Sequence, residues 1–360
     1  QFGANLGGPI IKDKLFFFVN WERYDRKRDS PQRFVSIATE ALRNGDFSGT
    51  GVTIYDPASS SDPALRTPFP GNIIPANRID PGSAWLIARM PLPNVAGTTF
   101  VNNYTGQDKL SYERDNFDAK VNWQVKPNFQ TFAKFSYSPS LIYDGPILGD
   151  AGGDSIGGGQ PGTAPGDTYL ATLGGTYTFS PTLLLDVTLG YTHQKLGGEY
   201  DLDTNYGLED MGIPGTNGPD RLQGGIPSFQ ITNWSNMGNP NTGNPFQFND
   251  KQYVASISLQ WVKSSHAFRF GYDYQNQQMN HFQPQGGTFQ TVRGTFQFNG
   301  NMTRLQNGPT PADVRFNSWA DFLLGLPSGA GKVDQLRNPN SFRMLAHAAY
   351  VQDAWQVSRR

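Results

Sequence analysis

The chain has 360 residues, of which 29 are basic and 30 acidic, so its net charge is -1. A balance this close to neutral lacks the positive footprint of nucleic-acid binding, and we exclude DNA and RNA as primary partners. The absence of cysteine excludes disulfides, iron–sulfur ligation and thiol catalysis. With 41 glycines and 26 prolines, the composition argues against a helical protein and favours short strands joined by long loops.

The sequence carries no apolar run of the length that a transmembrane helix needs, about 18–20 residues. Its mean hydropathy is -0.51. Neither observation excludes a transmembrane β-barrel, because barrel strands alternate polar and apolar residues and escape a hydropathy scan. The periodicity of the chain therefore decides whether it spans a membrane.

Alternation of apolar and polar residues recurs in segments about ten to thirteen residues long, the length of a tilted membrane-spanning strand. In the clearest segment, Leu185, Val187 and Leu189 face one side while Asp186 and Thr188 face the other. Three segments alternate less regularly, namely the first, the fourth and the last. The predicted strands are, in chain order, 14–24, 115–125, 129–137, 168–179, 183–193, 252–261, 267–275 and 343–357.

Short and long connectors alternate strictly between these segments. Because antiparallel strands reverse direction each time, all short turns lie at one end of the sheet and all long loops at the other, which is the asymmetry of an outer-membrane barrel. We therefore predict an all-β fold, a partial transmembrane antiparallel β-barrel of about eight strands with short periplasmic turns and long extracellular loops. The short turns are 126–128, 180–182 and 264–265, and the long connectors are 27–112, 139–167, 196–250 and 281–342.

A soluble β-sandwich or a fragment of a surface adhesin is the alternative, since their strands also alternate and their loops also cluster at the ends. A sandwich does not need consistently apolar outer faces, so the pattern favours the barrel. Trp21, Trp123, Trp261 and Trp355 lie near the ends of predicted strands, where a membrane girdle places them. Core tryptophans would give the same pattern.

The residue pattern offers no catalytic, cofactor or metal site, and we do not expect an enzyme. No Ser-His-Asp order, GxSxG or HExxH occurs. The run Asp201, Asp203, Asn205, Gly207 resembles a calcium loop, but its glycine comes one residue late. Charges that face a wet lumen explain the carboxylates within the strands without catalysis. The remaining candidates are three such carboxylates and four widely spaced histidines, namely Asp118, Asp186, Asp273, His193, His266, His281 and His347.

A set of ordered motifs spreads over the whole chain. Together they resemble the barrel region of TonB-dependent outer-membrane transporters of the Oar-like type. The first two of them together are similar to the junction where a plug domain ends and the first barrel strand begins. The motifs are Gln1–Ile10, Lys12–Phe18, Gly45–Ser48, Ile54–Pro57, Pro68–Asn72, Ile74–Pro81, Pro91–Asn94, Gly225–Phe229, Ser265–Asp273, Gly294–Phe298, Asp321–Pro327 and Tyr350–Trp355.

The resemblance implies a 22-stranded barrel in the outer membrane of a Gram-negative bacterium, filled by an N-terminal plug. It also implies energy coupling to a TonB-type complex and import of an unidentified solute. On this interpretation residues 1–360 are the N-terminal part of the barrel domain, and the plug and the signal peptide lie outside the sequence. The partners would be outer-membrane lipid, the protein's own plug, the energy-coupling complex and the extracellular solute.

The long loops around 139–167, 196–250 and 281–342 are the expected solute-binding surface. Tyr206, Trp234 and Phe246 are the candidate contacts, because their rings can stack on a solute. Self-packing of the loops is the alternative for each residue. The segment 319–327 is predicted as a short amphipathic helix that ends at glycine and proline. The alternative function is that of a surface adhesion or glycan-binding β-protein without transport.

Overall fold

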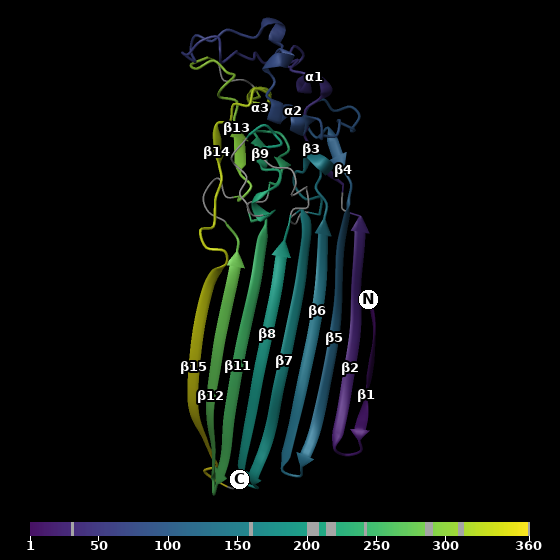
Figure 1. Cartoon of the computed structure of the whole chain (residues 1–360), viewed down its shortest axis with the longest axis vertical. Coiled ribbons are helices and arrows are strands. Elements are labelled where there is room, and N and C mark those ends of the chain that lie inside the picture. Colours follow the sequence, from purple (N-terminus) through teal and green to yellow (C-terminus); the bar gives the residue numbers. More distant parts are fainter. Residues whose placement is uncertain are drawn as a thin grey trace.

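The computed structural model describes residues 1–29, 32–157, 161–199, 209–213, 221–240, 243–284, 291–308 and 313–358. Its main feature is one antiparallel sheet of nine strands, in the order β1-β2-β5-β6-β7-β8-β11-β12-β15 (Figure 1). The sheet does not close on itself. Its strands are β1 (Phe2–Ile11), β2 (Leu15–Asp29), β5 (Lys109–Lys126), β6 (Phe129–Asp144), β7 (Gly162–Ser180), β8 (Leu183–Gly198), β11 (Phe246–Lys263), β12 (His266–Phe282) and β15 (Asn340–Trp355).

All eight predicted strands are present, and the sheet adds a ninth. The prediction began the strands at residue 14 and missed Phe2–Ile11, which is strand β1. Its Leu6 lies opposite Val19 of β2. Its glycines have no side chains to alternate, so a periodicity scan misses this strand. They also let it approach β2 closely, because a Cβ on Gly3 would stand only 2.4 Å from the Trp21 carbonyl oxygen. Backbone pairing therefore forms a strand that side-chain alternation does not reveal.

The connectors confirm the predicted alternation between short and long. Turns of two or three residues follow β1, β5, β7 and β11, and long connectors follow β2, β6, β8 and β12. Apart from β1, the strands have 15 to 19 residues and are longer than predicted. The added residues lie mostly at the loop ends, where polar side chains continue the pairing, so each long connector is shorter than expected.

The four long connectors fold together into one lobe at the loop end of the sheet (Figure 1). Backbone hydrogen bonds join all four: Ser235 N to Ser36 O at 2.9 Å, Gly153 N to Gly238 O at 3.0 Å, and Tyr55 N to Thr303 O at 2.8 Å. The elements of the lobe are β3 (Arg33–Val35), α1 (Glu40–Arg43), α2 (Pro81–Ile87), β4 (Tyr104–Gly106), β9 (Ser228–Ile231), β10 (Met237–Gly238), β13 (Thr295–Phe298), α3 (Arg315–Leu323) and β14 (Gly329–Gly331), with short 3-10 turns at Pro70–Asn72, Ala76–Arg78, Gly149–Ala151 and Arg221–Gln223.

The main hydrophobic core of the described residues lies in this lobe and not in the sheet. Its buried side chains come from every long connector, among them Leu42, Leu148, Met237 and Trp319. A single barrel wall has no second layer to bury, so its apolar face stays outside, whereas the connectors bury theirs against one another. The loops are thus a folded body and not independent excursions.

Helix α3 (Arg315–Leu323) lies at the centre of this core. The predicted helix over 319–327 was placed about one turn too late, because the helix ends at Leu323 and Gly325 follows with a φ of +65°. Trp319 donates from Nε1 to the Leu42 carbonyl oxygen at 3.0 Å. Among the described residues, no helix has the length and apolar character to cross a membrane.

Candidate functional site

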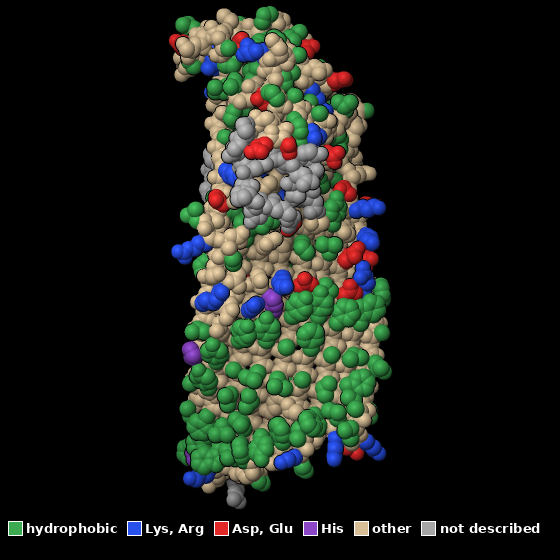
Figure 2. Space-filling view, in the orientation of Figure 1, with side chains coloured by type: hydrophobic (Ala, Val, Ile, Leu, Met, Phe, Trp, Pro, Cys, Tyr) green, Lys and Arg blue, Asp and Glu red, His purple; other side chains and the backbone are tan. Residues whose placement is uncertain are grey.

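The two faces of the nine-stranded sheet differ sharply in polarity. Register places Leu6, Phe135, Leu173, Leu189 and Ile257 on one face, which we call the outward face. These five side chains are 43–64% exposed. Figure 2 shows hydrophobic side chains covering the lower part of this view, with charged side chains gathered above them and at the bottom. An exposed apolar belt of this extent is typical of the lipid-facing wall of a membrane barrel.

Aromatic side chains line both borders of the apolar belt. At the loop end, Tyr137 stacks on Tyr169 with ring centroids 4.6 Å apart, and at the turn end Tyr177 contacts Phe179 at 4.7 Å. Ten residues separate Tyr169 from Phe179, or about 33 Å along the strand, which a tilt of roughly 40° reduces to about 25 Å. This is the height of a barrel's lipid-facing band, and the rings are its girdles.

The expected tryptophans occupy these borders. Trp21 lies at the loop end and donates from Nε1 to Asp115 at 3.0 Å. Trp123, Trp261 and Trp355 lie at the turn end of the outward face and are exposed. Their positions fit membrane girdles, where an amphipathic ring meets both lipid and water.

The opposite face, which we call the inward face, is polar, and two of its carboxylates are held by hydrogen bonds. Asp118 accepts from Ser136 Oγ at 2.5 Å and lies 3.6 Å from the Lys134 ammonium. Asp186 accepts from Thr176 Oγ1 at 2.6 Å. These contacts run between neighbouring strands, so they make a wall that stays hydrated without exposing unpaired polar groups to lipid.

The three predicted carboxylates share this face but do not converge. Asp118 and Asp186 lie in rows of the sheet about six residues apart, or about 20 Å along the strands. Within the described ranges, no group of three or more His, Asp or Glu side chains has the spacing to hold a metal ion.

The four histidines are also separate, and each has its own partner. His266 contacts Asp353 at 2.7 Å, His281 contacts Asp250 at 2.9 Å and His347 contacts Tyr272 at 2.6 Å. His193 contacts Asn249 at 2.6 Å. The run 201–207 lies outside the described residues.

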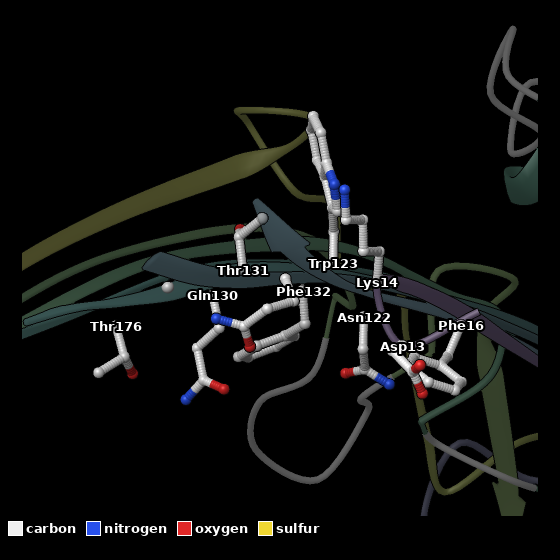
Figure 3. A pocket seen from close by; sticks show the side chains of 11 residues that line it. Asp13, Lys14, Phe16, Asn122, Trp123, Gln130, Thr131, Phe132 and Thr176 are labelled. Carbon is white, nitrogen blue, oxygen red and sulfur yellow. The ribbon is translucent and has the colours of Figure 1, made fainter. Parts of the chain in front are cut away.

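A hollow of about 380 Å³ opens near the turn end of the sheet. In Figure 3, Asn122, Gln130 and Thr176 point to one side of the ribbon, and Lys14 and Trp123 point to the other. Phe16 and Phe132 also line it. Amides and a hydroxyl beside two phenyl rings can hydrogen-bond a peptide or a polar solute and cover its apolar parts.

The candidate solute contacts fall in three different settings. Trp234 is only 8% exposed, contacts Trp319 at 5.7 Å and donates from Nε1 to the Arg315 carbonyl oxygen at 2.7 Å. Its environment is therefore the lobe core, as self-packing of the loops would place it. Phe246 begins β11, is half-buried and lies 4.9 Å from the Phe248 ring. Tyr206 lies outside the described residues. A role in solute contact stays a prediction for all three.

Two charged side chains, Asp321 and Arg43, are buried in the lobe and hydrogen-bonded there. The sequence pattern did not predict either of them. Asp321 of α3 is fully buried and accepts from Thr303 Oγ1 at 2.7 Å and Met302 N at 3.1 Å. Burial raises the pKa of Asp321 to about 6. Arg43 donates from Nε to the Ala38 carbonyl oxygen and from Nη1 to the Met90 carbonyl oxygen, both at 2.9 Å. Desolvation lowers the pKa of this guanidinium.

An apolar outward face with aromatic borders, a polar inward face and strictly alternating connectors define the wall of an outer-membrane β-barrel. Comparison with known families agrees. The model of the family described as outer membrane beta barrel domain matches residues 1–360, and the chain belongs to this family. It is therefore a protein of the outer membrane.

The other comparisons add little detail. No curated protein matches the chain. Among solved structures, the crystal structure of the outer membrane transporter YddB from Escherichia coli matches with a TM-score of 0.45 and 9% identity. The match covers 98% of this chain and 31% of YddB, so the chain spans about a third of that transporter's length.

Proposed function

We propose that the chain forms part of the wall and the outer loops of a TonB-dependent, Oar-like transporter that imports a solute under energy coupling. The observation that supports the proposal is the polar inward face, where carboxylates paired with hydroxyl groups line one side of the sheet. A wall built only as a structural anchor would not need this ladder of hydrogen-bonding groups. Transport would be conformational and would involve no covalent chemistry by these residues.

Each face and end of the sheet has a place in this proposal. The outward face contacts outer-membrane lipid, and the lobe faces the cell exterior, where it meets the solute. The hollow at the turn end offers amide and hydroxyl groups to the protein's own plug domain. The plug and the TonB-type complex enter by resemblance to the Oar-like transporters, and the proposed barrel is the 22-stranded one of that family.

Import can be tested without knowing the solute. Cells with and without the full-length protein are grown in a defined mixture of nutrients, and depletion of each compound is followed by mass spectrometry. We expect at least one compound to disappear only from cells that make the protein, and a protonophore to stop that loss. Depletion that persists without a proton gradient would contradict energy coupling.

The same cells test the adhesion alternative. If no compound is depleted and the cells instead gain attachment to glycan-coated surfaces, the protein is an adhesin and the transport proposal fails. The lobe is suited to presenting a fixed surface, since its four connectors share one core, so this outcome has a structural basis.

A further inference from the structure

The loop end of strands β2 and β5 carries arginines on its inward face. Register places Tyr24 opposite Arg114, Arg26 opposite Tyr112 and Arg28 opposite Leu110. The rings of Tyr24 and Tyr112 meet at 5.5 Å between centroids, which confirms that both lie on this face. Three guanidinium groups therefore surround a pair of aromatic rings where the wall meets the lobe.

Charge on these two strands is divided between the faces. On the outward face, Arg23 is paired with Glu113 at 2.9 Å and with Asp115 at 2.8 Å. Lys27 lies 3.7 Å from Asp25 and 3.6 Å from Glu113. The strand ends thus place these three carboxylates outward, where they neutralise the outward cations.

The inward cations have no such partners. None of the ion pairs or hydrogen bonds among the described residues involves the side chain of Arg26, Arg28 or Arg114. Arg26 and Arg28 are exposed. The Nε of Arg114 is shielded from solvent and has no hydrogen-bond partner. A shielded guanidinium nitrogen without an acceptor is costly, and among the described residues no protein group compensates the charge of Arg114 from within the fold.

Two inward carboxylates lie near the arginines, and among the described residues neither forms an ion pair with them. Glu22, one inward position below Tyr24, accepts a hydrogen bond from Gln1 Nε2 at 2.8 Å. Asp144 lies in the row of Arg28 beyond Leu110, is buried and accepts from Gly157 N at 2.8 Å. Three guanidinium groups thus face these two carboxylates, one of which is buried, and the patch keeps a net positive charge.

We propose that Arg26, Arg28 and Arg114, with Tyr24 and Tyr112, form a binding site for an anionic solute at the mouth of the lumen. The ligand class is a molecule with two or more carboxylate, sulfate or phosphate groups beside a flat ring or sugar. Guanidinium groups bind such oxyanions through paired hydrogen bonds, and the tyrosines stack on the ring. As a solute site it deepens the proposed function, although binding itself requires no transport.

The test uses the full-length protein in detergent and the fluorescent anion hydroxypyrene trisulfonate, whose flat ring carries several negative charges. Anisotropy titrations compare the wild type with the Arg26→Gln/Arg28→Gln variant. The matched control is Lys27→Gln, since Lys27 lies between the two arginines on the same exposed strand end but faces outward. We expect the double variant to bind about tenfold more weakly or worse, and the control to bind as the wild type does.

Salt and a second variant keep the result interpretable. Binding to the wild type should weaken as sodium chloride rises from low to physiological concentration, because the attraction is electrostatic. Tyr24→Ala should weaken binding of the probe more than binding of inorganic pyrophosphate, because pyrophosphate has no ring that could stack on the tyrosine. Equal loss in the Lys27→Gln control, or unchanged binding in the double variant, would overturn the proposal. Binding to the purified protein needs no energy source. The binding result therefore tests this site even if import in cells fails.

Discussion

Replacing Trp319 by alanine should unfold the lobe and leave the sheet in place. Trp319 is 1% exposed, contacts Phe322 at 5.0 Å and Trp234 at 5.7 Å, and donates to the Leu42 carbonyl oxygen. The substitution would leave a cavity the size of an indole in the core that joins the four connectors. Truncations of this kind cost about 3–5 kcal/mol, and the orphaned carbonyl of Leu42 adds to that.

Hydrogen exchange of the full chain in detergent measures this cost element by element. A loss of about 3–5 kcal/mol corresponds to a fall in amide protection of roughly a hundredfold to a few thousandfold. We expect that fall in β9, β13 and α3, and little change in β6, β7 and β8. The strands should persist because their hydrogen bonds run within the sheet and do not depend on the lobe core.

Trp123→Ala provides a control with the same side chain removed from the outward face, where the ring is 48% exposed. It should leave the protection of the lobe unchanged. Equal loss of protection in the lobe and the strands of the Trp319→Ala variant would show that both unfold as one unit. Unchanged protection in the lobe would show that the connectors do not depend on a shared core. Either result would refute the reasoning.

Two further predictions concern charge. Because burial raises the pKa of Asp321 to about 6, above its unfolded value near 4, the folded lobe holds more protons between these values, so its free energy of unfolding falls as pH rises through this window. Exchange protection of the lobe, measured at pH 4 and pH 7, should fall with pH in the wild type and should lose this dependence in Asp321→Asn. The same pH response in the wild type and the variant would contradict the prediction. Leu173→Arg on the outward face should cost about 2–4 kcal/mol and reduce insertion into vesicles, whereas Thr172→Arg on the inward face should insert normally. Equal insertion of the two variants would contradict the assignment of Leu173 to the outward face and Thr172 to the inward face.

The sequence predicted the sheet well because alternation and turn spacing are local signals. Leu185 to Leu189 show both faces of a strand within a few residues, and Ser264–Ser265 marks a turn directly. Strand β1 escaped because Gly3, Gly7 and Gly8 carry no side chain to alternate. That strand forms because it pairs with β2, and the pattern within a single segment does not show which segments pair.

The lobe could not be predicted for a different reason. Its core combines residues far apart in the sequence, such as Leu42 and Trp319, and no spacing rule links them. Trp234 is a candidate solute contact because its ring can stack on a solute, and no spacing rule shows that its ring neighbours Phe316 and Trp319 come from another connector. The inward arginines could not be predicted either. The predicted strand ended at residue 24, whereas β2 continues to Asp29, so the prediction assigned no face to Arg26 or Arg28.

The central claim is that the chain spans the outer membrane with its lobe outside and its short turns in the periplasm. Ser61→Cys in the first long connector and Thr182→Cys in a short turn test it directly, because both positions are exposed and this chain has no cysteine of its own. Intact cells that make the full-length protein, freed of any other cysteine, are treated with a membrane-impermeant maleimide. We expect labelling at 61, and labelling at 182 only after the outer membrane is opened. Equal labelling of both positions in intact cells would contradict a membrane-spanning wall.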